Sequence, residues 1–192
     1  MNLLVLVALG GVALVVLWGI AAYNGLVSMR NRAMASWSDV EVQLKRRHDL
    51  VGNLVETVKG YAQHERGTLE AVVQARNQAV GALSGGAPAA AAAAENVLTG
   101  ALRQLFALAE AYPDLKAATN FLDLQRSLAE LEDAVQNARR YYNAVVRDFN
   151  TGIQQFPNVL LAGTLGFRAF DFFELTDPAE AEVPTVDFGA TQ

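Results

Sequence analysis

Apolar side chains recur every seven residues between positions 121 and 156, and this spacing constrains the fold more than any other feature of the chain. A repeat sustained over several heptads is typical of a helix whose apolar face packs against partner helices. Pro157 marks the expected end of this helix. The positions that define the repeat are Phe121, Leu124, Leu128, Leu131, Val135, Ala138, Tyr142, Val145, Phe149 and Phe156.

A second periodic segment lies earlier in the chain, where no proline occurs between positions 23 and 82. Its apolar positions are Trp37, Val40, Leu44, Val51, Leu54, Val58, Tyr61, Val72 and Ala75. An unbroken helix of this length would be a rod of roughly 90 Å. The repeat falters between Gly60 and Gly67, so we expect either a break there or a surplus apolar face that meets another copy.

A third helix is predicted between these two segments, from about Ala89 to Ala111. Gly85 and Gly86 are expected to stop the preceding helix, and Pro88 suits the first turn of the next one. The fold class that follows is all-α. We expect an antiparallel long-helix bundle of three to four helices on a single N-terminal transmembrane helix.

Residues 3–22 are all apolar or glycine, which is about the length that a helix needs to cross a bilayer. Trp18 and Tyr23 lie near the end of this run, where aromatic rings favour the membrane interface. A cleaved secretory signal is the competing interpretation, but the segment lacks a basic start. Arg30 and Arg32 follow the span, which favours an outward N-terminus and a cytoplasmic domain.

The charge distribution divides the rest of the chain. Residues 169–192 carry six acidic side chains and no Lys or Arg, whereas the remainder is close to neutral. We therefore expect a transmembrane anchor over 1–23, a helical bundle over 24–175 and an acidic, disordered tail over 176–192. Such a distribution gives no support for nucleic-acid binding, which needs a basic surface.

No pattern in the chain predicts catalysis, a cofactor or a metal site. The sequence contains no cysteine, which excludes thiolate chemistry and disulfides. Its two histidines, His48 and His64, are not in Glu-x-x-His or His-Glu-x-x-His motifs. We expect both histidines on or beside a polar helix face, and we expect no enzymatic activity.

Several polar side chains are candidates for helix–helix contacts. Arg47 occupies a position of the apolar repeat, so we expect a buried charge that pairs with Glu132 or Asp133, rather than a contact with lipid headgroups. Gln136, Asn143 and Asn150 lie seven residues apart. They form either a solvated flank or an amide stripe that selects a partner helix.

The segment from Phe156 to Leu175 contains five phenylalanines within 18 residues. So many aromatic rings are too apolar to remain in solvent. They either pack over the end of the bundle or provide a surface for another copy, a partner protein or the membrane. The interface candidates among them are Phe167, Phe170, Phe172 and Phe173.

The ordered set of motifs along the chain resembles the LemA family of bacterial membrane proteins. The motifs include Trp37-Ser38, "VQLKRR" (42–47), "NLVETVKGYA" (53–62), "YPDLKA" (112–117), "ARRYYN" (138–143) and Phe172-Phe173-Glu174. The resemblance implies a single-pass inner-membrane protein with a cytoplasmic helical bundle and no established enzymatic activity. The chain departs from the family at Gly52, where the family commonly has proline, and Asn53 joins the candidate assembly residues.

Two functions are consistent with these features. The first is a membrane-anchored scaffold that self-assembles into homo-oligomers and organises or shapes the bilayer. Gly10, Gly11 and Gly19 within the span would let neighbouring spans approach closely. The second is an adaptor whose bundle recruits another membrane or signalling protein, such as a membrane protease.

Overall fold

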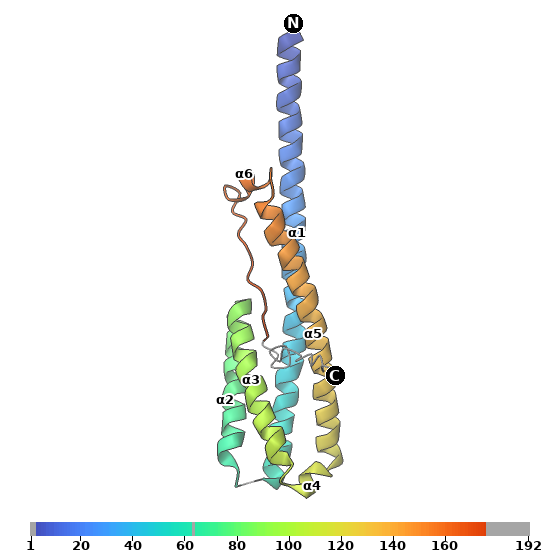
Figure 1. Cartoon of the computed structure of the whole chain (residues 1–192), viewed down its shortest axis with the longest axis vertical. Helices are drawn as coiled ribbons and strands as arrows, with labels where there is room; N and C mark the ends of the chain where they lie inside the picture. Colours follow the sequence, from blue (N-terminus) through green and yellow to red (C-terminus); the bar gives the residue numbers. More distant parts are fainter. Residues whose placement is uncertain (1–2, 63, 176–192) are drawn as a thin grey trace, which may run out of the picture.

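The computed structural model describes residues 3–62 and 64–175, and this part of the chain is helical with no strand. Four long helices and two short ones follow one another (Figure 1). They are α1 (Leu3–Tyr61), α2 (Arg66–Ser84), α3 (Pro88–Ala109), α4 (Pro113–Lys116), α5 (Thr119–Gln154) and α6 (Val159–Ala162). The predicted all-α fold with an antiparallel bundle is confirmed. The predicted acidic tail, 176–192, lies outside the described residues.

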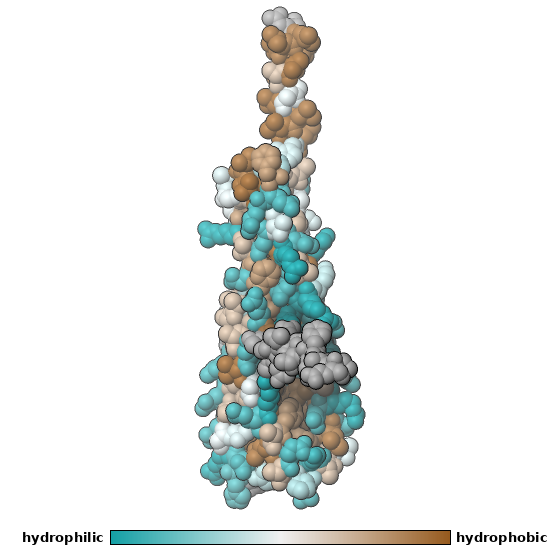
Figure 2. Space-filling view, in the orientation of Figure 1, coloured by the Kyte–Doolittle hydropathy of each residue, from teal (hydrophilic) through white to brown (hydrophobic). Residues whose placement is uncertain are grey.

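Helix α1 is continuous over 59 residues and joins the apolar segment to the bundle without a linker. At 1.5 Å per residue it is a rod of roughly 88 Å. Its N-terminal part stands alone above the other helices, and no part of its most apolar 18-residue window is buried (Figures 1 and 2). Leu26 is the first residue of α1 that is buried against the rest of the chain.

Of the two alternatives that the faltering repeat leaves open, the structure shows the break, because α1 ends at Tyr61 and α2 begins at Arg66. The chain reverses there and again between Ser84 and Pro88, so α2 and α3 form a helical hairpin packed along the lower half of α1 (Figure 1). The predicted linker is confirmed as well. Gly86 has φ of +70°, which glycine adopts without steric cost, and Pro88 is in the first turn of α3.

The core follows the heptad positions in three clusters stacked along the bundle. The lower cluster joins all four long helices, and the middle cluster joins α1, α5 and the tip of the α2–α3 hairpin. The upper cluster joins α1 and α5 to Ala162 of α6 and to Phe167. Fully buried members of the repeat include Val40, Leu44, Val51, Leu54, Val58, Val72 and Val135.

Two members of the predicted repeat are not in the core. Tyr61 is the last residue of α1 and is 45% exposed, because the chain reverses there and leaves its outer side open. Phe156 is 80% exposed, because α5 ends two residues earlier at Gln154 and the chain turns into α6. The repeat therefore predicts both helices correctly. It is wrong in expecting Tyr61 and Phe156, at or just beyond the ends of α1 and α5, to be buried.

After α6 the chain reverses and runs back along the bundle as an extended segment (Figure 1). We call residues 167–175 the strap. Phe167 and Phe173 of the strap are buried in the upper and middle clusters. The upper half of the bundle thus consists of two long helices and the strap, whereas the lower half consists of four helices.

Candidate functional site

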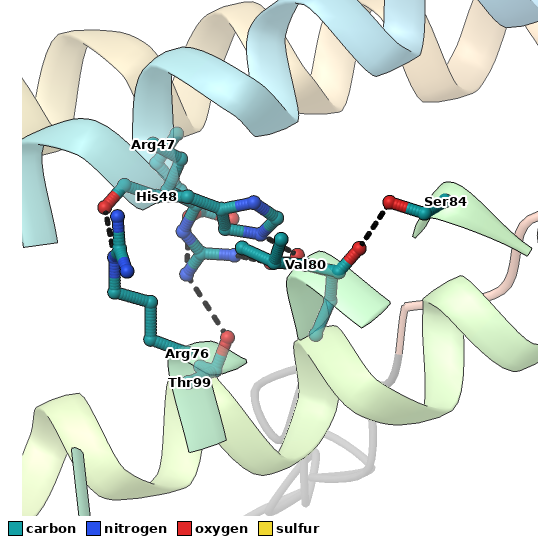
Figure 3. Close-up of polar contacts among 8 residues, drawn as sticks. Arg47, His48, Arg76, Val80, Ser84 and Thr99 are labelled. Carbon is teal, nitrogen blue, oxygen red and sulfur yellow. Dashed lines mark hydrogen bonds and ion pairs between the residues drawn. The ribbon is translucent and has the colours of Figure 1, made fainter. Parts of the chain in front are cut away.

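A cluster of charged side chains is buried where α1 meets α3 and α5. Arg47 of α1 donates a hydrogen bond to Glu95 of α3 at 2.9 Å and another to Thr99 at 3.0 Å (Figure 3). Its guanidinium also pairs with Glu132 of α5 at 3.0 Å. The side chains of Arg47 and Glu95 are 5% and 1% exposed, so this ion pair is almost fully removed from water.

His48 contacts the second oxygen of the same carboxylate, with Nε2 2.6 Å from Oε1 of Glu95. Its side chain is 3% exposed. Both histidines are expected from the sequence on or beside a polar helix face, but His48 is buried, because the hairpin places Glu95 over it. His64 is exposed in the turn between α1 and α2.

Helix α2 is connected to this cluster through Arg76, whose Nε donates to the backbone carbonyl of His48 at 2.6 Å (Figure 3). The guanidinium lies over Gly52, where a Cβ atom would meet it at an ordinary contact distance of 3.7 Å. Residues from all four long helices therefore meet around Arg47 and His48. A buried charge without its partner is costly, so a shift of one helix that separated these side chains would destabilise the bundle.

In the described part of the chain, the acidic and imidazole side chains of this cluster do not form a metal-binding group. Among the described residues, no group of three or more His, Asp or Glu side chains could hold a metal ion. Each oxygen of Glu95 already contacts a basic side chain. The chemistry that the geometry supports is charge pairing between helices.

Beside the cluster lies an open groove of about 520 Å³ between α3 and α5, which have little direct contact with each other. Apolar side chains line part of it, and charged ones line the rest. Its lining includes Arg47, Leu102, Arg103, Phe106, Leu128 and Glu132. The groove provides a partly apolar surface between two helices that would suit a partner segment.

The strap is held by two asparagines of α5 that bind its backbone. Asn143 donates to the carbonyl of Phe173 at 3.0 Å and accepts from its N–H at 2.9 Å. Asn150 makes the same pair of bonds with Phe170, each at 2.9 Å. Each amide thus binds both backbone groups of one extended residue, as a neighbouring β-strand would.

Two further side chains of α5 donate hydrogen bonds to backbone carbonyls of the strap. The Tyr142 hydroxyl donates to the carbonyl of Asp171 at 2.8 Å, and Arg139 donates to the carbonyl of Leu175 at 2.8 Å. Burial, with a smaller contribution from the Asp171 charge, raises the pKa of Tyr142 to about 12. At the other end of the bundle, a hydrogen bond to Glu65 is the main cause that raises the pKa of Tyr112.

Replacing Asn143 with alanine is expected to loosen the strap without unfolding the bundle. Two hydrogen bonds are lost, at about 0.5–1.5 kcal/mol each. Hydrogen–deuterium exchange over residues 167–175 should become faster, whereas exchange over the α2–α3 hairpin should not change. Asn137→Ala, an exposed asparagine on the same helix, is the matched control. Equal exchange in both variants would show that the side-chain amide does not hold the strap.

The residues predicted from the sequence to act in assembly differ in how exposed they are and in what they contact. Gln136 donates to Glu132 within α5 and lines the groove, and Asn53 is exposed on α1. Asn143, Asn150, Phe167 and Phe173 make contacts within the chain, and their role in assembly stays a prediction. Phe170 is partly buried against Phe149, and Phe172 is 37% exposed.

The membrane-anchor candidates lie on one continuous helix. Trp18 is partly buried, and the ring of Tyr23 lies 5.9 Å from that of Phe167, at the top of the bundle. Arg30 and Arg32 are exposed about two to two and a half turns beyond Tyr23 along α1. Aromatic and basic side chains therefore follow the apolar segment in the order expected at a membrane surface.

Sequence reasoning missed Glu95, although one signal could have found it. Glu95 is the only charged residue between Arg76 and Arg103, in a segment rich in alanine. A lone carboxylate on a mostly apolar helix requires a partner when that helix packs. The two basic residues of "VQLKRRHD" that occupy or adjoin the apolar repeat, Arg47 and His48, provide it.

Comparison with known proteins gives one family and a few curated relatives. Residues 36–188 match the model of the LemA family. Magnetosome protein MamQ of Magnetospirillum gryphiswaldense is 28% identical over 174 residues, which covers 79% of this chain and 64% of the relative. Magnetosome protein MamQ 2 of Paramagnetospirillum magneticum is 27% identical over 175 residues, with the same coverage.

A third relative, Protein LemA of Metamycoplasma hominis, is 25% identical over 163 residues, covering 84% of this chain and 73% of the relative. The chain thus spans somewhat less than two thirds of the length of the magnetosome relatives. None of these names specifies a reaction.

Proposed function

The chain belongs to the LemA family, and we propose that it is a membrane-anchored helical scaffold that assembles with its own copies and organises or shapes the bacterial membrane. The observation that carries this proposal is the continuity of α1. A helix without a linker transmits the orientation of the span to the bundle, so copies that associate would impose a fixed geometry on the bilayer. We propose no catalytic activity.

The structure changes the reason for expecting self-assembly. The chain reversal after Tyr61 packs most of the apolar repeat within one molecule, so a surplus of the repeat no longer supports association. Two other features support it. Gly10, Gly11 and Gly19 have open space around them, which allows spans to approach closely. Val73 and Val80, one heptad apart on α2, are each 39% exposed.

We further propose that the protein lies in the inner membrane with its N-terminus outside and its bundle in the cytoplasm. Exposed Arg30 and Arg32 directly follow the span, and Lys and Arg near a span favour the cytoplasmic side. The partners in this proposal are lipids and other copies of the chain.

Mass measurement of the full chain in mild detergent or lipid nanodiscs tests the scaffold proposal. We expect a homo-oligomer that becomes smaller in Val73→Lys/Val80→Lys, because lysine places two charges on the proposed contact. Gln74→Lys/Gln78→Lys adds the same charge at exposed polar positions of α2 and should leave the mass unchanged. A wild-type chain that is monomeric at all concentrations would contradict self-assembly.

The groove between α3 and α5 favours an alternative function as an adaptor. Its apolar and charged lining would suit a helix of another membrane or signalling protein, such as a membrane protease. A monomer that binds one such partner, with binding lost in Phe106→Asp, would support this alternative over the scaffold.

A further inference from the structure

Exposed apolar side chains gather around α6, at the end of the bundle from which the span emerges. Phe156 is 80% exposed, Leu160 64%, Val159 49% and Leu165 45%. We call these four residues the α6 collar. Arg168 is the only charged residue between positions 151 and 170. Large apolar side chains concentrated in this way indicate an interaction surface.

Contacts within the chain fix where the collar lies relative to the span. Leu26 of α1, Phe149 and Ile153 of α5, and Ala162 and Phe167 form one buried cluster. Phe167 also meets the ring of Tyr23 edge to face. The collar is therefore beside α1 at the level of residues 23–26, at the point where the single helix leaves the bundle (Figure 1).

The length of the apolar segment sets the position of the collar relative to the membrane. Residues 3–22 rise roughly 30 Å, the thickness of a hydrocarbon core. Tyr23 follows at once, so the level of Tyr23 is the level of the membrane surface. In Figure 2 a hydrophobic patch at the top of the bundle adjoins the hydrophobic stem.

We propose that the α6 collar inserts into the interfacial layer of the bilayer beside the span and forms a second membrane contact. Phenylalanine, leucine and valine side chains gain free energy from burial at the boundary between headgroups and acyl chains. The exposed Arg168 next to them suits anionic headgroups. The inference depends on membrane insertion of α1, and it holds for either orientation of the span.

A second contact beside the axis would restrict how the rod tilts and rotates. A lone transmembrane helix tilts from the membrane normal, and its tilt and rotation are set by neighbouring helices and by interfacial anchors. The collar lies on one side of α1, so the bundle would present the same side relative to the membrane in every copy. This deepens the scaffold proposal but does not depend on self-assembly.

Spin labelling tests the proposal, and the absence of native cysteine makes single-site labels straightforward. The full chain is reconstituted in phosphatidylcholine vesicles with a nitroxide at Phe156→Cys or Leu160→Cys. Leu14→Cys, 69% exposed within the span, is the membrane reference. Val97→Cys, an apolar residue of α3 that is 53% exposed, is the aqueous reference.

We expect the collar labels to collide with oxygen several-fold more, relative to a water-soluble nickel chelate, than the Val97 label does. The ratio should lie between those of the two references. A collar ratio equal to that of Val97 would overturn the proposal. Labels shielded from both reagents, as contact with a second copy or a protein would produce, would also overturn it.

Two further measurements distinguish a change in collar exposure from misfolding and from a change in self-assembly. Circular dichroism of each labelled chain should match wild type, since the collar side chains are largely outside the core. The oligomeric mass of the same sample is measured in parallel. A monomer whose collar labels report a lipid environment would contradict the scaffold and support the collar, and an oligomer with aqueous collar labels would do the reverse.

Discussion

Glu95→Ala is expected to lower the free energy of unfolding by about 3–5 kcal/mol, the cost of breaking a buried ion pair by removing one partner. The carboxylate of Glu95 is 1% exposed and contacts both Arg47 and His48, at 2.9 and 2.6 Å. Its removal leaves the buried guanidinium with Glu132 and Thr99 alone, and it leaves His48 Nε2 without this acceptor. Chemical denaturation of the full chain in detergent, followed by circular dichroism, measures the change.

Glu132→Ala is the matched control, because this carboxylate pairs with the same guanidinium at nearly the same distance, 3.0 Å, but is 40% exposed. Solvent screens the exposed pair, so the expected loss is about 1 kcal/mol or less. Equal losses in the two variants would show that burial of Glu95 does not determine the cost. Arg47→Met/Glu95→Leu should recover part of the stability lost in Glu95→Ala, since no unpaired guanidinium remains.

The helices could be predicted from the sequence because a heptad repeat records which residues of a helix face other helices. Val51, Leu54, Val135 and Tyr142 are buried as the spacing predicts. Gly60–Gly67 and Gly85–Pro88 were recognisable as turns, since glycine and proline alter backbone preferences locally. The same logic predicts a buried Arg47, and Glu132, one of the two acidic partners predicted for it, pairs with it.

The partners of the polar residues were much harder to predict. The heptad repeat predicts that Asn143 and Asn150 lie on one face of the helix. It does not predict whether their side chains bind another amide, water or a backbone group. Their partners, Phe173 and Phe170, are 30 and 20 residues away in a segment with no periodicity. Glu95 is likewise 48 residues from Arg47 across two turns, so its contact depends on the register of the hairpin.

Phe173→Ala is the second substitution for which we expect a large effect, a loss of about 3–5 kcal/mol, as for other buried Phe→Ala changes. Phe173 is 0% exposed and belongs to the middle cluster of the core. Its ring meets Trp37 edge to face at 5.5 Å, and Trp37 in turn packs against Tyr142 at 5.2 Å. The alanine variant leaves a cavity between α1, α5 and the strap, and residue 173 itself keeps its two backbone bonds to Asn143.

Phe172→Ala, one residue earlier, is the matched control, because it removes the same side chain from a site that is 37% exposed. Its expected cost is smaller, since less apolar surface returns to water. Trp37 fluorescence provides a local measurement in a Trp18→Phe background, where Trp37 is the only tryptophan. The emission should shift to longer wavelength in Phe173→Ala and stay unchanged in Phe172→Ala. If both variants lost the same stability with no change in emission, the strap would not be an integral part of the core, and the upper half of the bundle would rest on α1 and α5 alone.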